Sequence, residues 1–179
     1  MCYIGLAILC ISSVQASNKE ISIESLLREM IDRKSLAQFP NPAYSCKQFS
    51  SYDRATVNPA DKSWFANNDR SMFIRLDTTR GRKEYVMMET DGPGAIVRFW
   101  MTFAGRGAGN GTLRVYFDNQ KEPAIIGRAL DIISGGQLVG VPLSTSVSEL
   151  TDYKMRGHNL YLPLPYARHC KVTYETNNI

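Results

Sequence analysis

Alternation of apolar and polar residues over short runs is the feature that most constrains this chain. Every second side chain is apolar in residues 95–103, and residues 112–117 repeat the pattern. A period of two is typical of a β-strand with one buried face. Three further strands are expected at residues 84–89, 122–126 and 170–175. Turn signals separate the runs at residues 91–94, 110–111, 119–120 and 135–136.

Short strands joined by Gly- and Pro-rich turns predict a mainly all-β fold, a jelly-roll-like antiparallel β-sandwich over residues 40–179. The Asn110-Gly111 pair in particular suits a two-residue hairpin bend, because both positions of that turn need a positive φ.

One amphipathic helix is expected before the strands, in an N-terminal helical segment over residues 17–39. Residues 22–33 carry an apolar stripe at helical spacing, made of Ile23, Leu26, Leu27, Met30 and Ile31. Ser22 is the expected N-cap, and Glu24 suits the positive end of the helix dipole. The stripe needs a partner, either the following domain or a second subunit.

The first sixteen residues differ from the rest, because they carry no Asp, Glu, Lys or Arg. An apolar run over residues 4–11 is followed by Val14-Gln15-Ala16, which is typical of a cleaved signal peptide over residues 1–16. The run is too short for a membrane span. We therefore expect an exported protein, periplasmic or extracellular. Cys46 and Cys170 would remain after cleavage, as one disulfide or as two separate thiols.

Composition and charge limit the classes of molecule that this protein is expected to bind. The formal net charge is +4, and the basic residues are scattered apart from a small group at residues 80–83. A nucleic-acid surface usually has a denser basic patch, so no nucleic acid is expected. No CxxC pair or His-rich spacing occurs, so no metal site and no cofactor are expected.

Six unusual strings occur in one order along the chain. They are QFSSYDR (48–54), WFAN (64–67), DGPGAIVRFW (91–100), LRVYFD (113–118), PLS (142–144) and YLPLPY (161–166). This ordered series resembles glycoside hydrolase family 172, from the N-terminal helix to the end of the chain.

The resemblance implies a tandem pair of jelly-roll sandwiches, retaining hydrolysis of furanosides such as fructofuranosides or arabinofuranosides, and homo-oligomers with active sites near subunit contacts. The family's two catalytic Glu residues lie in a later part and have no counterpart here. The chain is therefore expected to be the first half of a larger unit, and its catalytic residues stay unknown.

The carboxylates of this chain have structural explanations. A retaining glycosidase needs two carboxyl groups about 5 Å apart. Glu84 and Glu89 bracket one expected strand, and their spacing of five residues places them on opposite faces. Asp91 and Asp118 stand at turns, where a short acceptor side chain binds backbone amides.

A first group of expected sugar-binding residues is Tyr52, Asp53, Arg54 and Trp64. A carboxylate beside an arginine can bind sugar hydroxyls, and an aromatic face can stack on a sugar ring. The alternative is an Asp53–Arg54 pair that only holds a loop.

A second group is Arg98 and Trp100, which share one face of their expected strand. They suit a sugar subsite, and they equally suit a cation–π contact under a loop or a subunit interface. His158 and His169 are expected to be surface histidines, because neither has an acid nearby in the sequence.

Two functions follow from these residues. The chain is expected to be the N-terminal β-sandwich part of a secreted glycoside hydrolase that binds carbohydrate. The alternative is a non-catalytic carbohydrate-binding or interaction module without chemistry of its own.

Overall fold

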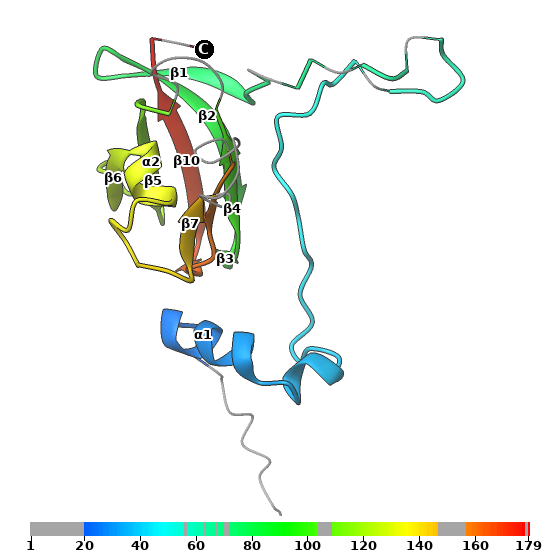
Figure 1. Cartoon of the computed structure of the whole chain (residues 1–179), viewed down its shortest axis with the longest axis vertical. Coiled ribbons are helices and arrows are strands. Elements are labelled where there is room, and N and C mark those ends of the chain that lie inside the picture. Colours follow the sequence, from blue (N-terminus) through cyan, green and yellow to red (C-terminus); the bar gives the residue numbers. More distant parts are fainter. Residues whose placement is uncertain are drawn as a thin grey trace, which may run out of the picture.

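The chain folds as a two-layer antiparallel β-sandwich with a separate N-terminal helix, as the computed structural model shows (Figure 1). The structure describes residues 20–55, 57–62, 64–66, 68–69, 72–103, 109–146, 157–177 and 179. The expected signal peptide at residues 1–16 lies outside these residues. The expectation of a mainly antiparallel β-sandwich is confirmed.

The first layer is a five-stranded sheet in the order β1-β2-β10-β5-β6. Its strands are β1 (Arg75–Thr79), β2 (Arg82–Asp91), β5 (Thr112–Phe117), β6 (Ile125–Arg128) and β10 (His169–Glu175). All neighbours in this sheet pair antiparallel. Strand β10 therefore lies at the centre although it comes last in the sequence.

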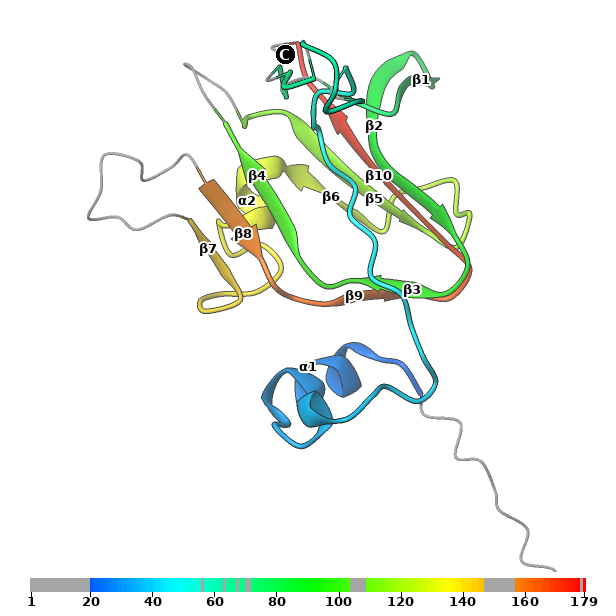
Figure 2. The same cartoon turned by 90° about the vertical axis from the view of Figure 1, so that its right-hand side faces the viewer.

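The second layer comprises a three-stranded sheet in the order β4-β8-β7 and the short pair β3-β9 (Figure 2). Its strands are β3 (Gly94–Ile96), β4 (Phe99–Thr102), β7 (Ser144–Ser146), β8 (Gly157–Leu160) and β9 (Leu164–Tyr166). The chain passes between the layers four times, from β2 to β3, from β4 to β5, from β6 to β7 and from β9 to β10.

The core lies between the two layers. The inward side chains of β5 and β10 form its centre, and they are Leu113, Val115, Cys170, Val172 and Tyr174. The short helix α2 (Ala129–Ile133) lies against both layers and adds three buried side chains, Ala129, Ile132 and Ile133. Burial of a side chain such as Ile132 or Ile133 stabilises the fold by about 1.5–3 kcal/mol.

The strand predictions differ in accuracy. The strand at 112–117 is confirmed to the residue as β5. The expected strand at 95–103 is wrong in one respect, because it divides into β3 and β4 with a break at Val97 and Arg98. Val97 is consequently exposed, whereas Phe99 and Met101 face inward as the alternation predicts.

The two-residue hairpin turn occurs at a different place from the one expected. Arg80 and Gly81 have φ values of 53° and 77°, and they connect β1 to β2 with Thr79 opposite Arg82. Positive φ at both central residues is the requirement of a type I′ turn. Asn110 is not among the non-glycine residues with positive φ, so the expectation of such a bend at Asn110-Gly111 is wrong.

A β-bulge changes which side chains share a face. In the pairing of β2 with β10, Val172 lies opposite Met88 but Thr173 lies opposite Val86, so Met87 has no partner. One extra residue reverses the alternation beyond it. Glu84 and Glu89 therefore lie on the same, outward face of the five-stranded sheet, and the expectation that they lie on opposite faces is wrong.

Residues before β1 form an extension beside the sandwich (Figures 1 and 2). The helix α1 (Ile23–Ile31) begins at the predicted N-cap Ser22, whose hydroxyl accepts a hydrogen bond from the backbone N–H of Ser25. A single 3₁₀ turn follows at Ser35–Ala37. From residue 38 to residue 73, the described residues contain no helix or strand.

Candidate functional site

The outer face of the β4-β8-β7 sheet carries the second expected group. Trp100 lies opposite Asn159 on β8, and Asn159 lies opposite Thr145 on β7. Side chains of directly paired residues point to the same face, so these three form one row across the sheet. Half of Trp100 is exposed, at 51%. Its ring is therefore available to a ligand on the solvent side.

Arg98 and Tyr161 extend this row along the strand direction. The guanidinium carbon of Arg98 lies 5.7 Å from the centre of the Tyr161 ring, which is a cation–π distance. The Oδ1 atom of Asn159 accepts long hydrogen bonds from Arg98 Nη2 at 3.4 Å and from Tyr161 Oη at 3.5 Å. We call the five residues Arg98, Trp100, Thr145, Asn159 and Tyr161 the Trp100 face.

The cation–π contact that the sequence left as an alternative is thus present, but with Tyr161 and at the surface. Sequence reasoning missed Thr145, Asn159 and Tyr161 as members of this face. They lie 45 to 63 residues from Trp100 and Arg98, and the pairing of β4 with β8 and of β8 with β7 brings them together. Local alternation on β8 and β7 is too short to signal that pairing.

The first expected group lies in a separate loop, residues 50–72, which we call the Asp53 loop. Asp53 is 8% exposed, and its two carboxylate oxygens accept hydrogen bonds from the backbone N–H groups of Ala55 and Asn68, each at 3.0 Å. The N–H of Asp53 donates to Asp69 Oδ1 at 2.8 Å. The carboxylate therefore holds two distant parts of the loop together.

Arg54 closes the same loop at its ends. Its guanidinium donates to the carbonyl of Met72 at 2.9 Å and to that of Ser50 at 3.4 Å. Its guanidinium carbon also lies 5.0 Å from the centre of the Tyr52 ring. Asp53 and Arg54 both bind backbone groups instead of each other, which differs from the ion pair that the sequence suggested as an alternative.

The aromatic residues of the loop point outward. Trp64 is 41% exposed and packs edge-on against Phe65, with ring centres 5.7 Å apart. Tyr52 is 54% exposed. The Asp53 loop is thus held together by hydrogen bonds to its own backbone and exposes aromatic rings. Among the described residues, no hydrogen bond or ring contact connects this loop to the Trp100 face.

The carboxylates of the five-stranded sheet are engaged with other side chains. Glu84 is fully buried and accepts hydrogen bonds from Thr173 Oγ1, Tyr116 Oη and Arg82 Nη2, at 2.8, 2.9 and 3.0 Å. Burial opposes ionisation, but the hydrogen bonds from Thr173, Tyr116 and Arg82 outweigh it and hold the pKa of Glu84 below its usual value. Glu84 is therefore a charged structural group without access to a ligand.

Glu89 and Asp77 form a second charged cluster on the same face. Arg75 bridges them, with Nε 2.7 Å from Asp77 Oδ1 and Nη2 2.5 Å from Glu89 Oε2. The hydrogen bond from Arg75 holds the pKa of Asp77 below its usual value. His169 Nε2 lies 3.3 Å from Glu89 Oε1. Each carboxylate is thus neutralised by a cation of the chain itself.

Both histidines are buried, so the expectation of surface histidines is wrong. His169 is 8% exposed and contacts Glu89, an acid that is 80 residues distant but lies near it across the β2–β10 pairing. His158 is 1% exposed, and its Nδ1 lies 2.6 Å from Ser134 Oγ. Cross-strand pairing supplied partners that sequence proximity could not reveal.

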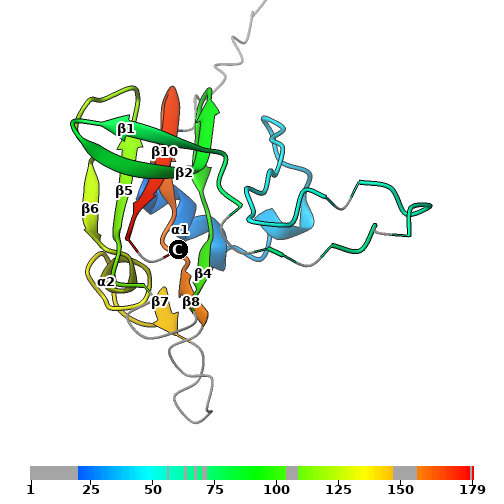
Figure 3. The same ribbon diagram turned by 90° about the horizontal axis from the view of Figure 1, so that it is seen from above.

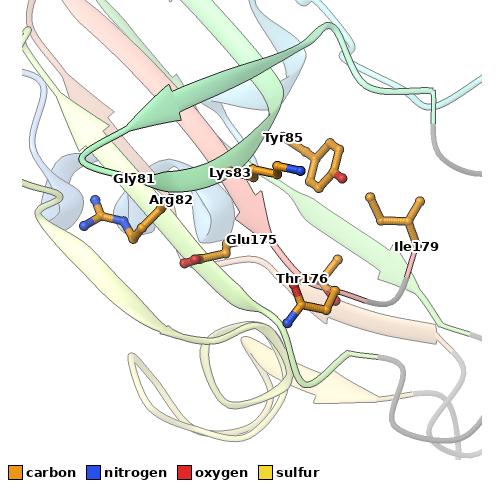
Figure 4. A pocket seen from close by; sticks show the side chains of 8 residues that line it. Gly81, Arg82, Lys83, Tyr85, Glu175, Thr176 and Ile179 are labelled. Atoms are coloured by element: carbon orange, nitrogen blue, oxygen red, sulfur yellow. The ribbon is translucent and has the colours of Figure 1, made fainter.

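An open depression of about 650 Å³ lies under the β1–β2 hairpin near the end of β10 (Figure 4). Its lining residues are Gly81, Arg82, Lys83, Tyr85, Glu175, Thr176, Asn177 and Ile179. None of the expected binding residues belongs to it. Its carboxylate, Glu175, pairs with Arg114 at 2.7 Å.

The described residues include two cysteines, Cys46 and Cys170. Cys46 is exposed and Cys170 is buried, and both are free thiols, so they are not joined in a disulfide. Burial raises the pKa of Cys170 to about 12. Within the described ranges no group of three His, Cys, Asp or Glu side chains is arranged to hold a metal ion.

Fold and surface together define an antiparallel β-sandwich module whose exposed faces carry aromatic and hydrogen-bonding side chains. The chain belongs to glycoside hydrolase family 172. A family model described as the GH172 first beta-sandwich domain matches residues 42–179. This match confirms the resemblance found in the sequence strings.

No curated protein and no solved structure matches the chain. No helix among the described residues has the length and apolar character needed to cross a membrane.

Proposed function

We propose that this chain is the N-terminal sandwich of an exported glycoside hydrolase that acts on furanosides of the fructofuranoside or arabinofuranoside type, as a homo-oligomer. Family membership over residues 42–179 supports the hydrolase class. The observation that carries the role of this chain is the Trp100 face, because it combines an exposed ring with polar groups on paired strands.

The chemistry of the Trp100 face suits a sugar. A furanose ring has one apolar surface of C–H groups, which can stack on the exposed indole of Trp100. Its hydroxyls need donors and acceptors at the ring edge, and Arg98, Asn159 and Thr145 supply both kinds. The paired strands hold these groups in place before a ligand binds, so little ordering entropy is lost on binding.

The Asp53 loop supplies the second part of the proposed binding surface through Tyr52 and Trp64. In this proposal Asp53 and Arg54 act as positioning residues, because their side chains bind the loop backbone. The exposed rings of Tyr52 and Trp64 then contact the sugar.

We propose that the catalytic Glu pair is absent from this chain. Glu84 is fully buried, and Glu89 pairs with Arg75 and His169, so neither is free to attack an anomeric carbon. In this proposal the sandwich binds and orients the sugar, and the two reacting carboxylates come from another part of the full protein.

The alternative is a carbohydrate-binding module without chemistry of its own. The same observation favours it, because the Trp100 face needs no carboxylate to bind a sugar. The two functions differ in the fate of the bound sugar when the full-length protein is tested.

Replacement of Trp100 tests the binding role. Trp100→Ala should weaken binding of fructofuranosyl or arabinofuranosyl oligosaccharides by about tenfold or more, because the stacking surface is lost. Isothermal titration calorimetry on the whole chain measures this. Phe39→Ala is the matched control, since Phe39 is fully exposed, outside both proposed binding surfaces, and should leave the affinity unchanged.

Equal binding by wild type and Trp100→Ala would refute the Trp100 face as a sugar site. A panel of nitrophenyl furanosides then separates the two functions. We expect no turnover from this chain and turnover from the full-length protein. Turnover by this chain that is lost in Asp53→Asn would overturn the assignment of the chemistry to another part.

A further inference from the structure

The open depression under the β1–β2 hairpin has no part in the binding surfaces described above, although it is large enough for a small ligand. Its volume of about 650 Å³ lies within the usual range of small-molecule sites, roughly 300–1,000 Å³. Figures 3 and 4 show the hairpin crossing over β10. The depression therefore belongs to the five-stranded sheet, whereas the Trp100 face belongs to the other layer.

The depression forms where two paired strands separate. Strand β2 begins at Arg82, but its pairing with β10 reaches only to Tyr85, which lies opposite Tyr174. Strand β10 continues to Glu175, which pairs with Thr112 of β5. Among the described strands, residues 82–84 of β2 are thus paired with β1 alone. The opening on their other side leaves side chains and backbone groups of both strands available to a ligand.

The charged side chains around this opening are neutralised by buried partners, with one exception. Arg82 pairs with the buried Glu84 at 3.0 Å, and Glu175 pairs with the buried Arg114 at 2.7 Å. Lys83 is exposed, and in the described ranges no carboxylate lies within ion-pair distance of its ammonium group. These five groups carry three positive and two negative charges, so the positive charge of Lys83 is left unbalanced.

The guanidinium of Arg114 is a second, independent source of positive potential beside the depression. Arg114 is 6% exposed, and its Nε and Nη1 atoms have no hydrogen-bond acceptor among the described residues. Buried N–H groups normally have acceptors, and a guanidinium has five of them. Its bound partner Glu175 lines the depression, so the excess of donors lies directly behind that wall.

We propose that the depression binds the oxyanion group, a carboxylate or a phosphate, of a small hydroxylated ligand. The ammonium of Lys83 supplies the positive charge, and the amide of Asn177 supplies a neutral donor from the β10 side. This site goes beyond the proposed function, because none of its residues belongs to the Trp100 face or to the Asp53 loop.

Glu175 gives the site its preference for a hydroxylated ligand. Its carboxylate lines the same depression, and Figure 4 shows its side chain between those of Arg82 and Thr176. A carboxylate accepts hydrogen bonds from hydroxyl groups but repels a second negative charge. A ligand with one oxyanion and several hydroxyls, such as a sugar acid or a sugar phosphate, therefore fits both walls.

Titration with three related sugars tests the site. Isothermal titration calorimetry on the whole chain compares glucuronate, glucose 6-phosphate and uncharged glucose. At least one of the two anions should bind at least about tenfold more tightly than glucose, because a hydrogen bond to a charged group is worth more than a neutral one. A preference between the two anions identifies the bound group as a carboxylate or as a phosphate.

Replacement of Lys83 shows where the anion binds. Lys83→Gln removes the unbalanced charge from an exposed position and should weaken binding of the anion by about tenfold. Lys121→Gln is the matched control, because Lys121 is an exposed lysine between β5 and β6 and outside the depression, and it should leave the affinity unchanged.

Three results would overturn the proposal. The first is that neither anion binds more tightly than glucose. The second is binding that Lys83→Gln leaves unchanged, and the third is equal weakening by Lys83→Gln and Lys121→Gln, which would show attraction to the net charge of the protein alone.

Discussion

At the scale of single residues, the strongest determinants are side chains whose partners lie far away in the sequence. Glu84 binds Tyr116 and Thr173, which are 32 and 89 residues distant. Asp118 shows the same principle, because its Oδ1 accepts hydrogen bonds from the backbone N–H groups of Ala167, Arg168 and His169. One carboxylate thus ties the β5–β6 turn to the turn before β10.

Replacement of Glu84 should be costly. Glu84→Gln removes the charge and places an amide N–H₂ group against donors, so buried hydrogen bonds are left unpaired. We expect a loss of about 3 kcal/mol in the free energy of unfolding, measured by urea denaturation at neutral pH. Glu122→Gln is the control, since Glu122 is exposed and pairs with Arg80 at the surface, and it should change stability by less than about 1 kcal/mol.

The same carboxylate predicts a pH dependence. The pKa of Glu84 is lowered in the folded protein, so its stabilising contribution is present above the pKa of the unfolded chain and is lost as the pH falls through the folded value. The difference in stability between wild type and Glu84→Gln should therefore be constant near neutral pH and shrink below about pH 4. A difference that grows on acidification would contradict this assignment.

At the scale of elements, the sequence predicted those helices and strands whose boundaries depend on neighbouring residues. The helix boundary at Ser22 and the strand β5 were predicted because a cap, a stripe and an alternation lie within a few residues. The strands β7, β8 and β9 have three or four residues each, and pairing across the sandwich decides their existence. The bulge at Met87 depends on β10, so the shared face of Glu84 and Glu89 could not be read from the spacing.

The β1–β2 turn gives a prediction at this scale. Gly81 has a φ of +77° and no heavy atom within 4 Å of an added Cβ, so Gly81→Ala acts through backbone strain alone. We expect it to destabilise the protein by about 1 kcal/mol, seen as a lower urea midpoint with an unchanged slope. Gly140→Ala is the control, because Gly140 also has open space but no positive φ.

At the scale of the whole molecule, the sandwich and the N-terminal segment of residues 20–49 are separable, because the described residues of that segment do not pack against the core cluster.

The candidate site was only partly predicted, because the fold brings together residues that are distant in the sequence. The sequence signalled Arg98 and Trp100 because they share one strand, whereas Asn159 and Tyr161 join them through the fold. In the Asp53 loop the residues were identified, but the engagement of Asp53 with Asn68 depends on how the loop closes.

Removal of the residues before Pro42 tests this separation. A chain that begins at Pro42 should melt within about 2 °C of the whole chain, because none of the described residues before Phe73 belongs to or packs against the core cluster. Differential scanning calorimetry measures it. A chain that begins at Arg80 is the comparison, since it also loses Phe73 and β1, and it should melt well below both. A large fall for the first chain would show that the residues before Pro42 stabilise the sandwich.

Cys46 and Cys170 differ in redox reactivity because one is exposed and the other is buried. Cys170 stays protonated under all ordinary conditions, because burial raises its pKa to about 12, and a thiol without a thiolate form exchanges poorly. Cys46 lies exposed in the segment before the Asp53 loop. In an oxidising compartment Cys46 is the thiol of this pair that can form mixed disulfides, so oxidation of this pair begins at Cys46.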